Sequence, residues 1–325
     1  MFKRIIVPLD GSGRAERAIP IAARLARVSG GSIFLVRVVS TEAASLPSVP
    51  GRPLLIQTVG ETDRALAESY LTGIASSDLL AGIEVHNEVP TGLIAPSILA
   101  IASDKQADIV VICSHGYTGV TRWWMMGSVA AKVARYARTP VLVLREGGPV
   151  PSERHPGEQP LRVLVPLDGS DDAKAALMPA ATLAASLAFP GQGGLHLTHV
   201  VRPSATAPKV GRLSDMGRMR QANQNMAWEY LKALISQFGD RIKDAAGANL
   251  NLKLTASVTV DDDIAQGIIS VAENGDGEGT EMFGGCDVIA MTTHGYGGRQ
   301  HWVGSVTERV LDTSRMPLLI VQPGA

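Results

Sequence analysis

The hexapeptide Val7-Pro8-Leu9-Asp10-Gly11-Ser12 occurs a second time, without change, as Val165-Pro166-Leu167-Asp168-Gly169-Ser170. Each copy joins a short apolar run, rich in β-branched residues in the first copy (Ile5–Leu9), to an Asp-Gly-Ser turn. Such a run is typical of a strand that is buried on both faces of a parallel sheet. The serine that follows is a good N-cap for a helix. The hexapeptide therefore predicts that each half of the chain begins with a buried strand leading into a helix.

Three further blocks recur in the same order in the two halves. They are His115-Gly116-Tyr117 with His294-Gly295-Tyr296, Gly127-Ser128-Val129 with Gly304-Ser305-Val306, and Pro140-Val-Leu-Val with Pro317-Leu-Leu-Ile-Val. Ordered self-similarity of this kind indicates a duplicated unit. The second copy is longer in its middle, where it contains the glycine-rich acidic stretch 274–285.

A segment rich in proline and glycine separates the copies. Residues 147–160 contain Pro149, Pro151, Pro156 and Pro160 together with three glycines, a composition that prevents a helix or an inner strand. We therefore expect a first domain at 1–146, a linker at 147–160 and a second domain at 161–325.

Strands and helices are expected to alternate within each domain. In the first, the pattern predicts strands at 5–9, 33–39, 83–89, 109–113 and 141–144, and helices at 15–27, 61–80, 93–104 and 128–137. In the second, strands are expected near Val163, Leu195, Leu252, Val288 and Leu318. This order predicts an α/β fold of two doubly wound, five-stranded parallel sheets with right-handed crossovers.

Composition and charge exclude several classes of protein. The 325 residues carry a net charge of -1, so no bulk charge favours nucleic acid or an anionic membrane. The two cysteines, Cys113 and Cys286, form neither a disulfide framework nor a CxxC metal pair. The amino terminus lacks the long apolar core of a signal peptide, and the most apolar segment, 175–189, is too short to span a bilayer. A cytoplasmic, soluble protein is expected.

The repeated motifs fall where an open α/β sheet binds ligands, beyond the carboxyl ends of its strands. Asp10 and Asp168 follow the first strand of each half, and Gly127-Ser128 and Gly304-Ser305 open a later helix. Free backbone N–H groups and the positive end of the helix dipole suit a phosphate at such a position. The sequence therefore predicts a nucleotide phosphate site.

Taken together, these motifs resemble the universal stress protein family in its tandem form. The resemblance covers both halves and rests on the Val-Pro-Leu-Asp-Gly-Ser opening, the Ser/Thr-His-Gly after the fourth strand, the Gly-Ser-Val helix start and the final apolar strand. It implies Rossmann-like domains of the adenine nucleotide alpha hydrolase type, a stress-response role in the cytoplasm, and ATP, ADP or AMP bound between the first and fourth strands. It also implies that the halves pair within one chain, with 141–144 against 318–321. Formation of a further homodimer and binding of an unknown protein partner stay open.

The resemblance assigns the cofactor-binding residues one by one. Asp10 and Asp168 would meet the ribose or a nucleotide-bound Mg²⁺, and the backbones of Val38 and Val200 would meet adenine. The phosphates would be held by Gly116, Gly127, Ser128 and Val129 in the first half and by Gly295, Gly304, Ser305 and Val306 in the second. Pro8 and Pro166, at the ends of the first strands, complete the two sets.

The phosphate loop departs from the family pattern Gly-x2-Gly-x9-Gly-Ser/Thr. Cys113 and Thr292 stand where the first glycine is expected, and the following spacer is one residue longer in the first half and one shorter in the second. Three functions therefore stay open: a nucleotide-binding regulator, a scaffold that has lost the ligand, and a slow ATP hydrolase. The chain contains no P-loop, no GxGxxG after the first strand and no GxSxG elbow, so enzymes of those classes are not expected.

Several of these residues also have a purely structural interpretation. Asp10 and Asp168 suit a turn ahead of a helix. His115 and His294 lack a second ligand or nucleophile nearby in sequence, which favours a structural role. Trp123-Trp124-Met125-Met126 and Trp302 are expected to pack a loop rather than to form an interaction surface, and Cys113 is expected to behave as a small hydrophobe.

Overall fold

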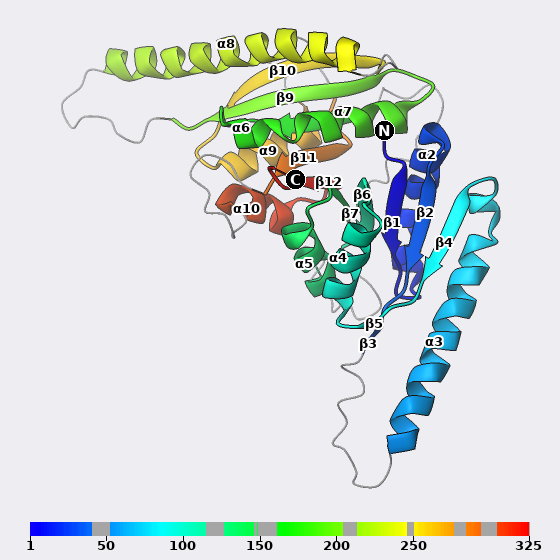
Figure 1. Cartoon of the computed structure of the whole chain (residues 1–325). Helices are drawn as coiled ribbons and strands as arrows, with labels where there is room; N and C mark the ends of the chain where they lie inside the picture. The colour runs from blue at the N-terminus through cyan, green and yellow to red at the C-terminus, as the bar shows by residue number, and fades with distance from the viewer. Residues whose placement is uncertain are drawn as a thin grey trace. The chain divides into compact units, whose positions relative to one another are not determined.

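The computed structural model describes residues 1–40, 53–114, 127–145, 148, 161–203, 213–245, 250–275, 284–293 and 304–324. The chain divides into two compact units, Met1–Gly148 and Pro149–Gly324. Each unit is an α/β domain built on a parallel sheet (Figure 1). The expected fold class is confirmed.

The first unit is built on a five-stranded parallel sheet. Its strands are β1 (Arg4–Pro8), β2 (Ser32–Val36), β4 (Glu84–Glu88), β6 (Ile109–Cys113) and β7 (Val141–Leu144). They pair in the order β4-β2-β1-β6-β7. The central strands are fully buried, with Ile5, Ile6 and Ile109 at 0% exposure, as the continuous apolar runs predict.

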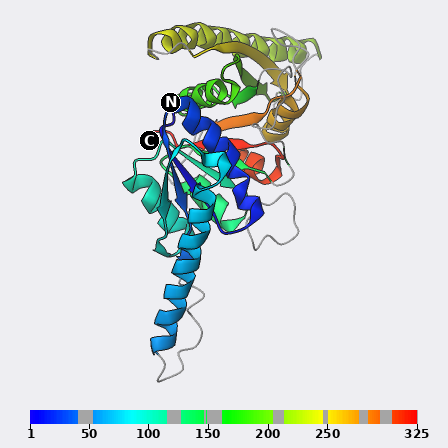
Figure 2. The same cartoon turned by 90° about the vertical axis from the view of Figure 1, so that its right-hand side faces the viewer.

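Helices cover both faces of this sheet. They are α1 (Gly13–Glu16), α2 (Ala18–Ser29), α3 (Pro53–Ala75), the short 3-10 helix η2 (Asp78–Leu80), α4 (Ile94–Asp104) and α5 (Ser128–Tyr136). α2 packs on β1 through buried alanine and isoleucine side chains, whereas α4 and α5 pack against each other on the opposite face (Figure 1). Figure 2 shows that the C-terminal part of α3 lies beside the sheet and that its N-terminal part extends beyond it.

The second unit repeats this plan. Its strands are β8 (Arg162–Pro166), β9 (Gly193–Val201), β10 (Leu252–Val260), β11 (Val288–Thr292) and β12 (Leu318–Val321), paired in parallel in the order β10-β9-β8-β11-β12. Its helices are α6 (Asp171–Lys174), α7 (Leu177–Ala188), α8 (Leu213–Ala245), α9 (Ile264–Asn274) and α10 (Ser305–Thr313). All five strands lie where the sequence predicts them.

The Asp-Gly-Ser turn has the same geometry in both units. Gly11 and Gly169 each have φ +89°, a backbone conformation that residues with a Cβ rarely adopt. The hydroxyl of Ser12 accepts a hydrogen bond from the N–H of Ala15 at 3.2 Å, and Ser170 caps α6 in the same way. The predicted N-cap is confirmed, and the glycine explains how the chain turns from strand to helix.

Three predicted elements of the first unit differ from the structure. The single helix expected at 15–27 is divided into α1 and α2, with Arg17 between them. The strand expected at 33–39 breaks after Val36, and a separate short strand β3 (Val39–Ser40) pairs with β5 (Thr91–Gly92). Pro90 interrupts the partner strand because it has no N–H to give to the ladder. The helix expected at 61–80 runs instead from Pro53, at a position that favours proline, to Ala75.

Some expectations lie outside the described residues. These include the two repeated histidines, the Trp123–Met126 segment, Trp302 and nearly all of the 147–160 segment. The pairing of 141–144 with 318–321 stays a prediction. None of the helices in the described part of the chain is long and apolar enough to cross a bilayer.

Candidate functional site

The first unit has a topological switch point between β1 and β6. β1 pairs with β2 on one side and with β6 on the other. The helices that follow β1 and β6 lie on opposite faces of the sheet, so their divergence leaves a crevice beyond the carboxyl ends of the two strands. Ligands of open α/β sheets bind in this position.

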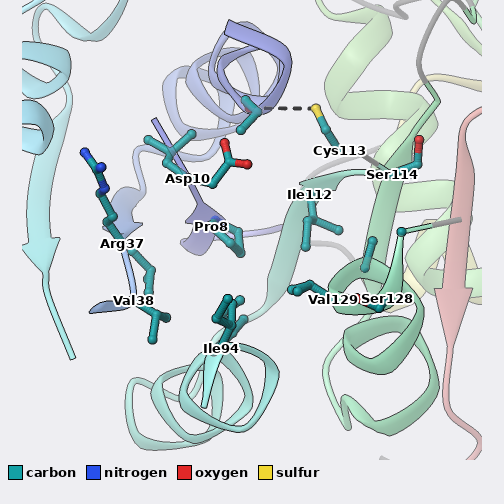
Figure 3. A pocket seen from close by; sticks show the side chains of 16 residues that line it. Pro8, Asp10, Arg37, Val38, Ile94, Ile112, Cys113, Ser114, Ser128 and Val129 are labelled. Atoms are coloured by element: carbon teal, nitrogen blue, oxygen red, sulfur yellow. Dashed lines mark hydrogen bonds between the residues drawn. The ribbon is translucent and has the colours of Figure 1, made fainter. Parts of the chain in front are cut away.

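A cavity of about 320 Å³ occupies this crevice (Figure 3). Its volume lies in the range of small-molecule pockets, about 300–1,000 Å³. The walls are mainly apolar: Figure 3 shows Ile94 of α4, Val129 of α5 and Ile112 of β6 around Pro8 at the end of β1. The cavity is lined by Pro8, Leu9, Asp10, Ala15, Val36, Arg37, Val38, Ile94, Ile98, Ile112, Cys113, Ser114, Gly127, Ser128, Val129 and Ala130.

The amino terminus of α5 forms one side of the cavity. Its N-cap is Gly127, which provides no side-chain acceptor for the first-turn N–H groups. The N–H of Gly127 donates to the carbonyl of Ser114 at 2.8 Å, which ties the helix start to the end of β6. Backbone donors and the positive end of the helix dipole therefore line the cavity, an arrangement that suits an anion.

Asp10 lines the cavity and also holds the turn. Its Oδ1 accepts hydrogen bonds from the backbone N–H of Ser12 at 3.0 Å and from the Ser12 hydroxyl at 2.6 Å. Asp168 makes the same two contacts with Ser170, at 2.9 and 2.6 Å. The structural interpretation of these carboxylates thus has a geometric basis, and their proposed contact with a ligand stays a prediction.

Arg37 also lines the cavity. Its guanidinium lies 4.8 Å from the centre of the Tyr70 ring, and the Tyr70 hydroxyl donates to Glu16 at 2.8 Å. Burial and this hydrogen bond raise the pKa of Tyr70 well above its usual range. The phenol is therefore neutral at physiological pH and anchors α3 to α1 beside the site.

Cys113 stands at the end of β6, where the family pattern has glycine. Its Sγ lies 3.7 Å from the carbonyl oxygen of Ala15 and is directed toward α1 (Figure 3). The thiol lines the cavity without blocking it, because the cavity extends past it to Ser114.

The structure brings most of the expected first-half residues together. Pro8, Asp10, Val38, Gly127, Ser128 and Val129 all line the one cavity, and Gly116 lies outside the described residues. The predicted site residues did not include Leu9, Ala15, Val36, Arg37, Ile94, Ile98, Ile112, Cys113, Ser114 and Ala130, although Cys113 and Ser114 belong to motifs that the sequence places at this edge of the sheet. Arg37 had a usable signal, since a cation just beyond the second strand lies at the same edge of the sheet as Asp10. The apolar positions have the pattern of ordinary core residues.

In the second unit the expected residues lie on the corresponding elements. Pro166 ends β8, Asp168 follows it, and Gly304, Ser305 and Val306 open α10. Gly295 lies outside the described residues. Val200 packs closely on α9, since a Cβ at Gly267 would lie 2.9 Å from its Cγ1. Thr307, at the position of Ala130, donates its hydroxyl to the carbonyl of Thr292 at 2.8 Å.

The described residues of the two units form no metal centre made of protein ligands. Among the described residues, no three His, Cys, Asp or Glu side chains form a group that could hold a metal ion. A single carboxylate at Asp10 fits a cation only if a ligand phosphate supplies the remaining oxygens.

Comparison with known proteins gives one consistent family. The model of the universal stress protein family matches residues 1–145 and again 161–322. Universal stress protein Rv2623 of Mycobacterium tuberculosis is 26% identical over 322 residues, which cover 98% of this chain and 96% of that protein. Universal stress protein MJ0531 of Methanocaldococcus jannaschii is 28% identical over 147 residues, covering 45% of this chain and 84% of that protein.

Solved structures share the fold over nearly the whole chain. A universal stress protein from Archaeoglobus fulgidus superposes with a TM-score of 0.60 at 17% identity, covering 99% of this chain and 96% of that one. A protein of unknown function from Pseudomonas aeruginosa gives 0.57 at 14% identity, covering 99% and 93%. With two family matches that together span most of its length, the chain belongs to the universal stress protein family, in the tandem two-domain form.

Proposed function

We propose that the first unit binds an adenine nucleotide in the cavity between the ends of β1 and β6, and that the protein is a cytoplasmic stress-response regulator whose nucleotide state sets its shape and partners. The observation that carries the proposal is the cavity itself. It joins apolar walls to an uncapped helix amino terminus at the switch point of the sheet.

The lining suggests a position for each part of the ligand. Adenine fits the apolar region near Val38, Ile94 and Ile98, where a flat ring is removed from water. The phosphates fit the first turn of α5 at Ser128 and Val129, whose N–H groups have no side-chain cap. Asp10 then faces the ribose or a phosphate-bound Mg²⁺. When bound, Mg²⁺ would neutralise phosphate charge, and this chain would offer it one carboxylate.

Binding without efficient turnover is favoured by the side chains present. Among the described residues, the titratable groups that line the cavity are Asp10, Arg37 and Cys113. Oδ1 of Asp10 is held by the Ser12 turn, and Arg37 lies over the Tyr70 ring, so neither is arranged as a base for water. A scaffold that binds no nucleotide is the second candidate, because Cys113 replaces the first glycine of the phosphate loop.

Two measurements test the proposal. Purified protein is denatured and any released small molecule is identified by mass spectrometry, and nucleotide-free protein is titrated with ATP, ADP and AMP with and without Mg²⁺. We expect saturable binding of at least one adenine nucleotide. If nothing is released and ATP with Mg²⁺ does not bind at millimolar concentration, the scaffold is the correct function.

A further inference from the structure

Helix α4 of the first unit has an apolar outer face. Leu93, Pro96 and Ala100 are exposed and recur at the spacing of one helix face, and Leu93 is 52% exposed. Ile94 beside them is exposed as well. The helix has no charged residue before Asp104, its last position, whereas a surface helix normally carries polar side chains on its outer side. We call Leu93, Ile94, Pro96 and Ala100 the α4 face.

The corresponding helix of the second unit has an ordinary polar surface. α9 and α4 both have eleven residues, and both begin with Ile-Ala. Gln266 occupies the position of Pro96, and Ser270 occupies the position of Ala100. The fold of the repeat therefore does not require apolar side chains on the outside of this helix.

The first residue of the α4 face also departs from the usual chemistry of a helix start. In α9 the side chain of the N-cap Asp263 accepts hydrogen bonds from the N–H groups of Ala265 and Gln266, at 3.1 and 3.4 Å. Leu93 is the N-cap of α4 and provides no side-chain cap. Leucine is among the poorest N-cap residues, and this leucine is too exposed to stabilise the core. A residue that breaks a local rule without a gain for the fold is typical of a functional surface.

The neighbouring helix α5 exposes basic side chains. It packs beside α4 (Figure 1) and carries the exposed Lys132 and Tyr136, and the exposed Arg138 follows its end. Among the described residues, neither Lys132 nor Arg138 has an ion-pair partner. Residues 1–146 as a whole contain fifteen Lys and Arg against twelve Asp and Glu. Charge complementarity at this surface therefore favours an acidic partner.

We propose that the α4 face binds an amphipathic helix of a partner protein. The apolar stripe of that helix lies against Leu93, Pro96 and Ala100, and its acidic side chains lie toward Lys132 and the end of α5. Recognition of an amphipathic helix by an apolar surface is a recurring mode of protein binding. Tyrosine, here Tyr136 at 62% exposure, is enriched in such interfaces.

The proposed surface differs from the nucleotide site. Of the four residues of the α4 face, Ile94 lines the cavity and the other three do not. The proposal therefore does not depend on whether the cavity binds a nucleotide. Variants at Leu93 and Ala100 test it without touching the cavity wall.

A synthetic peptide is the probe for this surface on the full chain. It has about 18 residues, or roughly five helical turns, with leucines on one face and glutamates on both sides of that face. A control peptide has lysine in place of every glutamate. We expect the acidic peptide to bind saturably at about 10 μM and the lysine peptide to bind roughly tenfold more weakly, because Lys132 and Arg138 repel it. Backbone NMR signals of residues 93–100 should shift when the acidic peptide is added.

Two variants and one matched control separate binding from folding. Leu93→Asp gives α4 the N-cap residue that α9 already has, so the helix start is retained while a negative charge replaces an apolar contact. Ala100→Glu adds the same charge to the outer side of the helix. Each variant should weaken binding of the acidic peptide by roughly tenfold. Ser270→Glu, at the equivalent position of α9, should leave the affinity unchanged, and circular dichroism checks that all three proteins are folded.

Several results would overturn the proposal. It is wrong if the acidic peptide does not saturate at about 1 mM, if both peptides bind equally well, or if folded Leu93→Asp and Ala100→Glu keep the wild-type affinity. It is also wrong if the wild type sediments as a dimer that Leu93→Asp dissociates, because a second copy then covers the face. Binding of the wild type, but not of Leu93→Asp, to phosphatidylglycerol vesicles would instead identify a lipid surface. ATP titration of the same samples reports separately on the cavity.

Discussion

At the residue scale, Asp10 accepts two hydrogen bonds from Ser12 in the turn, and we propose that it also contacts the bound nucleotide or its Mg²⁺. Asn keeps the side-chain oxygen that accepts from Ser12 but removes the negative charge, whereas Ala removes both. We predict that Asp10→Ala lowers the free energy of unfolding by roughly 1 kcal/mol and that Asp10→Asn does not. Urea denaturation checks this difference.

The same pair of variants isolates the role of the charge in binding. Asp10→Asn should weaken ATP binding in the presence of Mg²⁺ more than in its absence, because only the carboxylate can contact the cation strongly. Asp168→Asn is the matched control from the second unit and should leave the first-unit site unaffected. If the wild type and Asp10→Asn bound ATP equally well, with and without Mg²⁺, the Asp10 carboxylate would not contact the nucleotide or its cation.

His199 should carry a measurable sign of its buried environment. Burial lowers its pKa and the Asp168 carboxylate partly opposes this, so we predict an NMR titration below the ordinary value of about 6.5 and a further decrease in Asp168→Asn. Because the folded state binds this proton less tightly than the unfolded chain, His199 reduces stability as the pH falls below about 6.5 and has no such effect above it. A midpoint above 6.5 would contradict the burial.

At the scale of the element, the amino terminus of α5 carries the proposed phosphate site. Ser128 is exposed and lies in the first turn of α5, where an acidic side chain interacts favourably with the helix dipole. We predict that Ser128→Glu leaves the melting temperature unchanged or slightly higher but abolishes nucleotide binding by charge repulsion. Ser305→Glu, at the same place in α10, is the control and should retain binding in the first unit. Calorimetry measures the melting temperature, and an ATP titration measures binding. If Ser128→Glu retained the ATP affinity of the wild type, the phosphates would have to bind elsewhere.

The bounds of the strands show which features of an element the local sequence can predict. β6 and β7 have the bounds that their apolar runs predict. Both strands are buried on both faces, so a continuous apolar run is enough to identify them in the sequence. The second strand was expected to continue to residue 39, yet it breaks after Val36. The cause is Pro90, which lies more than fifty residues away in the chain and meets Val39 only when the strands pair.

At the scale of the whole molecule, the duplication gives two similar units with different sites. Ala130 lines the first-unit cavity, while Thr307, its counterpart, is buried with its hydroxyl on the Thr292 carbonyl. We predict that Ala130→Thr weakens nucleotide binding by about tenfold, as expected for roughly 1–3 kcal/mol of steric conflict. Binding stoichiometry should stay at one tight site per chain in the wild type. Thr307→Ala should create or strengthen a second site, measured by isothermal titration.

The two opposite substitutions, Ala130→Thr and Thr307→Ala, have outcomes that would contradict this prediction. If the two units bind nucleotide equally, the wild type will show two equivalent sites and neither substitution will separate them. If Ala130→Thr loses binding only because the unit unfolds, circular dichroism at the titration temperature will show it. The wild-type titration therefore has to be compared with both variants under the same conditions.

The sequence by itself determined the fold class, the duplication and the residues at the strand ends, because buried apolar runs, glycine turns and helix caps are local chemistry that repeats wherever the same residues recur. Asp10, Gly127 and Ser128 could be chosen in that way. Only the tertiary structure decided that Arg37 and Ile98 complete the first cavity, and that His199, at the position of Arg37 in the repeat, lines a different pocket in the second unit. Cavities depend on which side chains from distant elements fill the same space, and no local pattern records that volume.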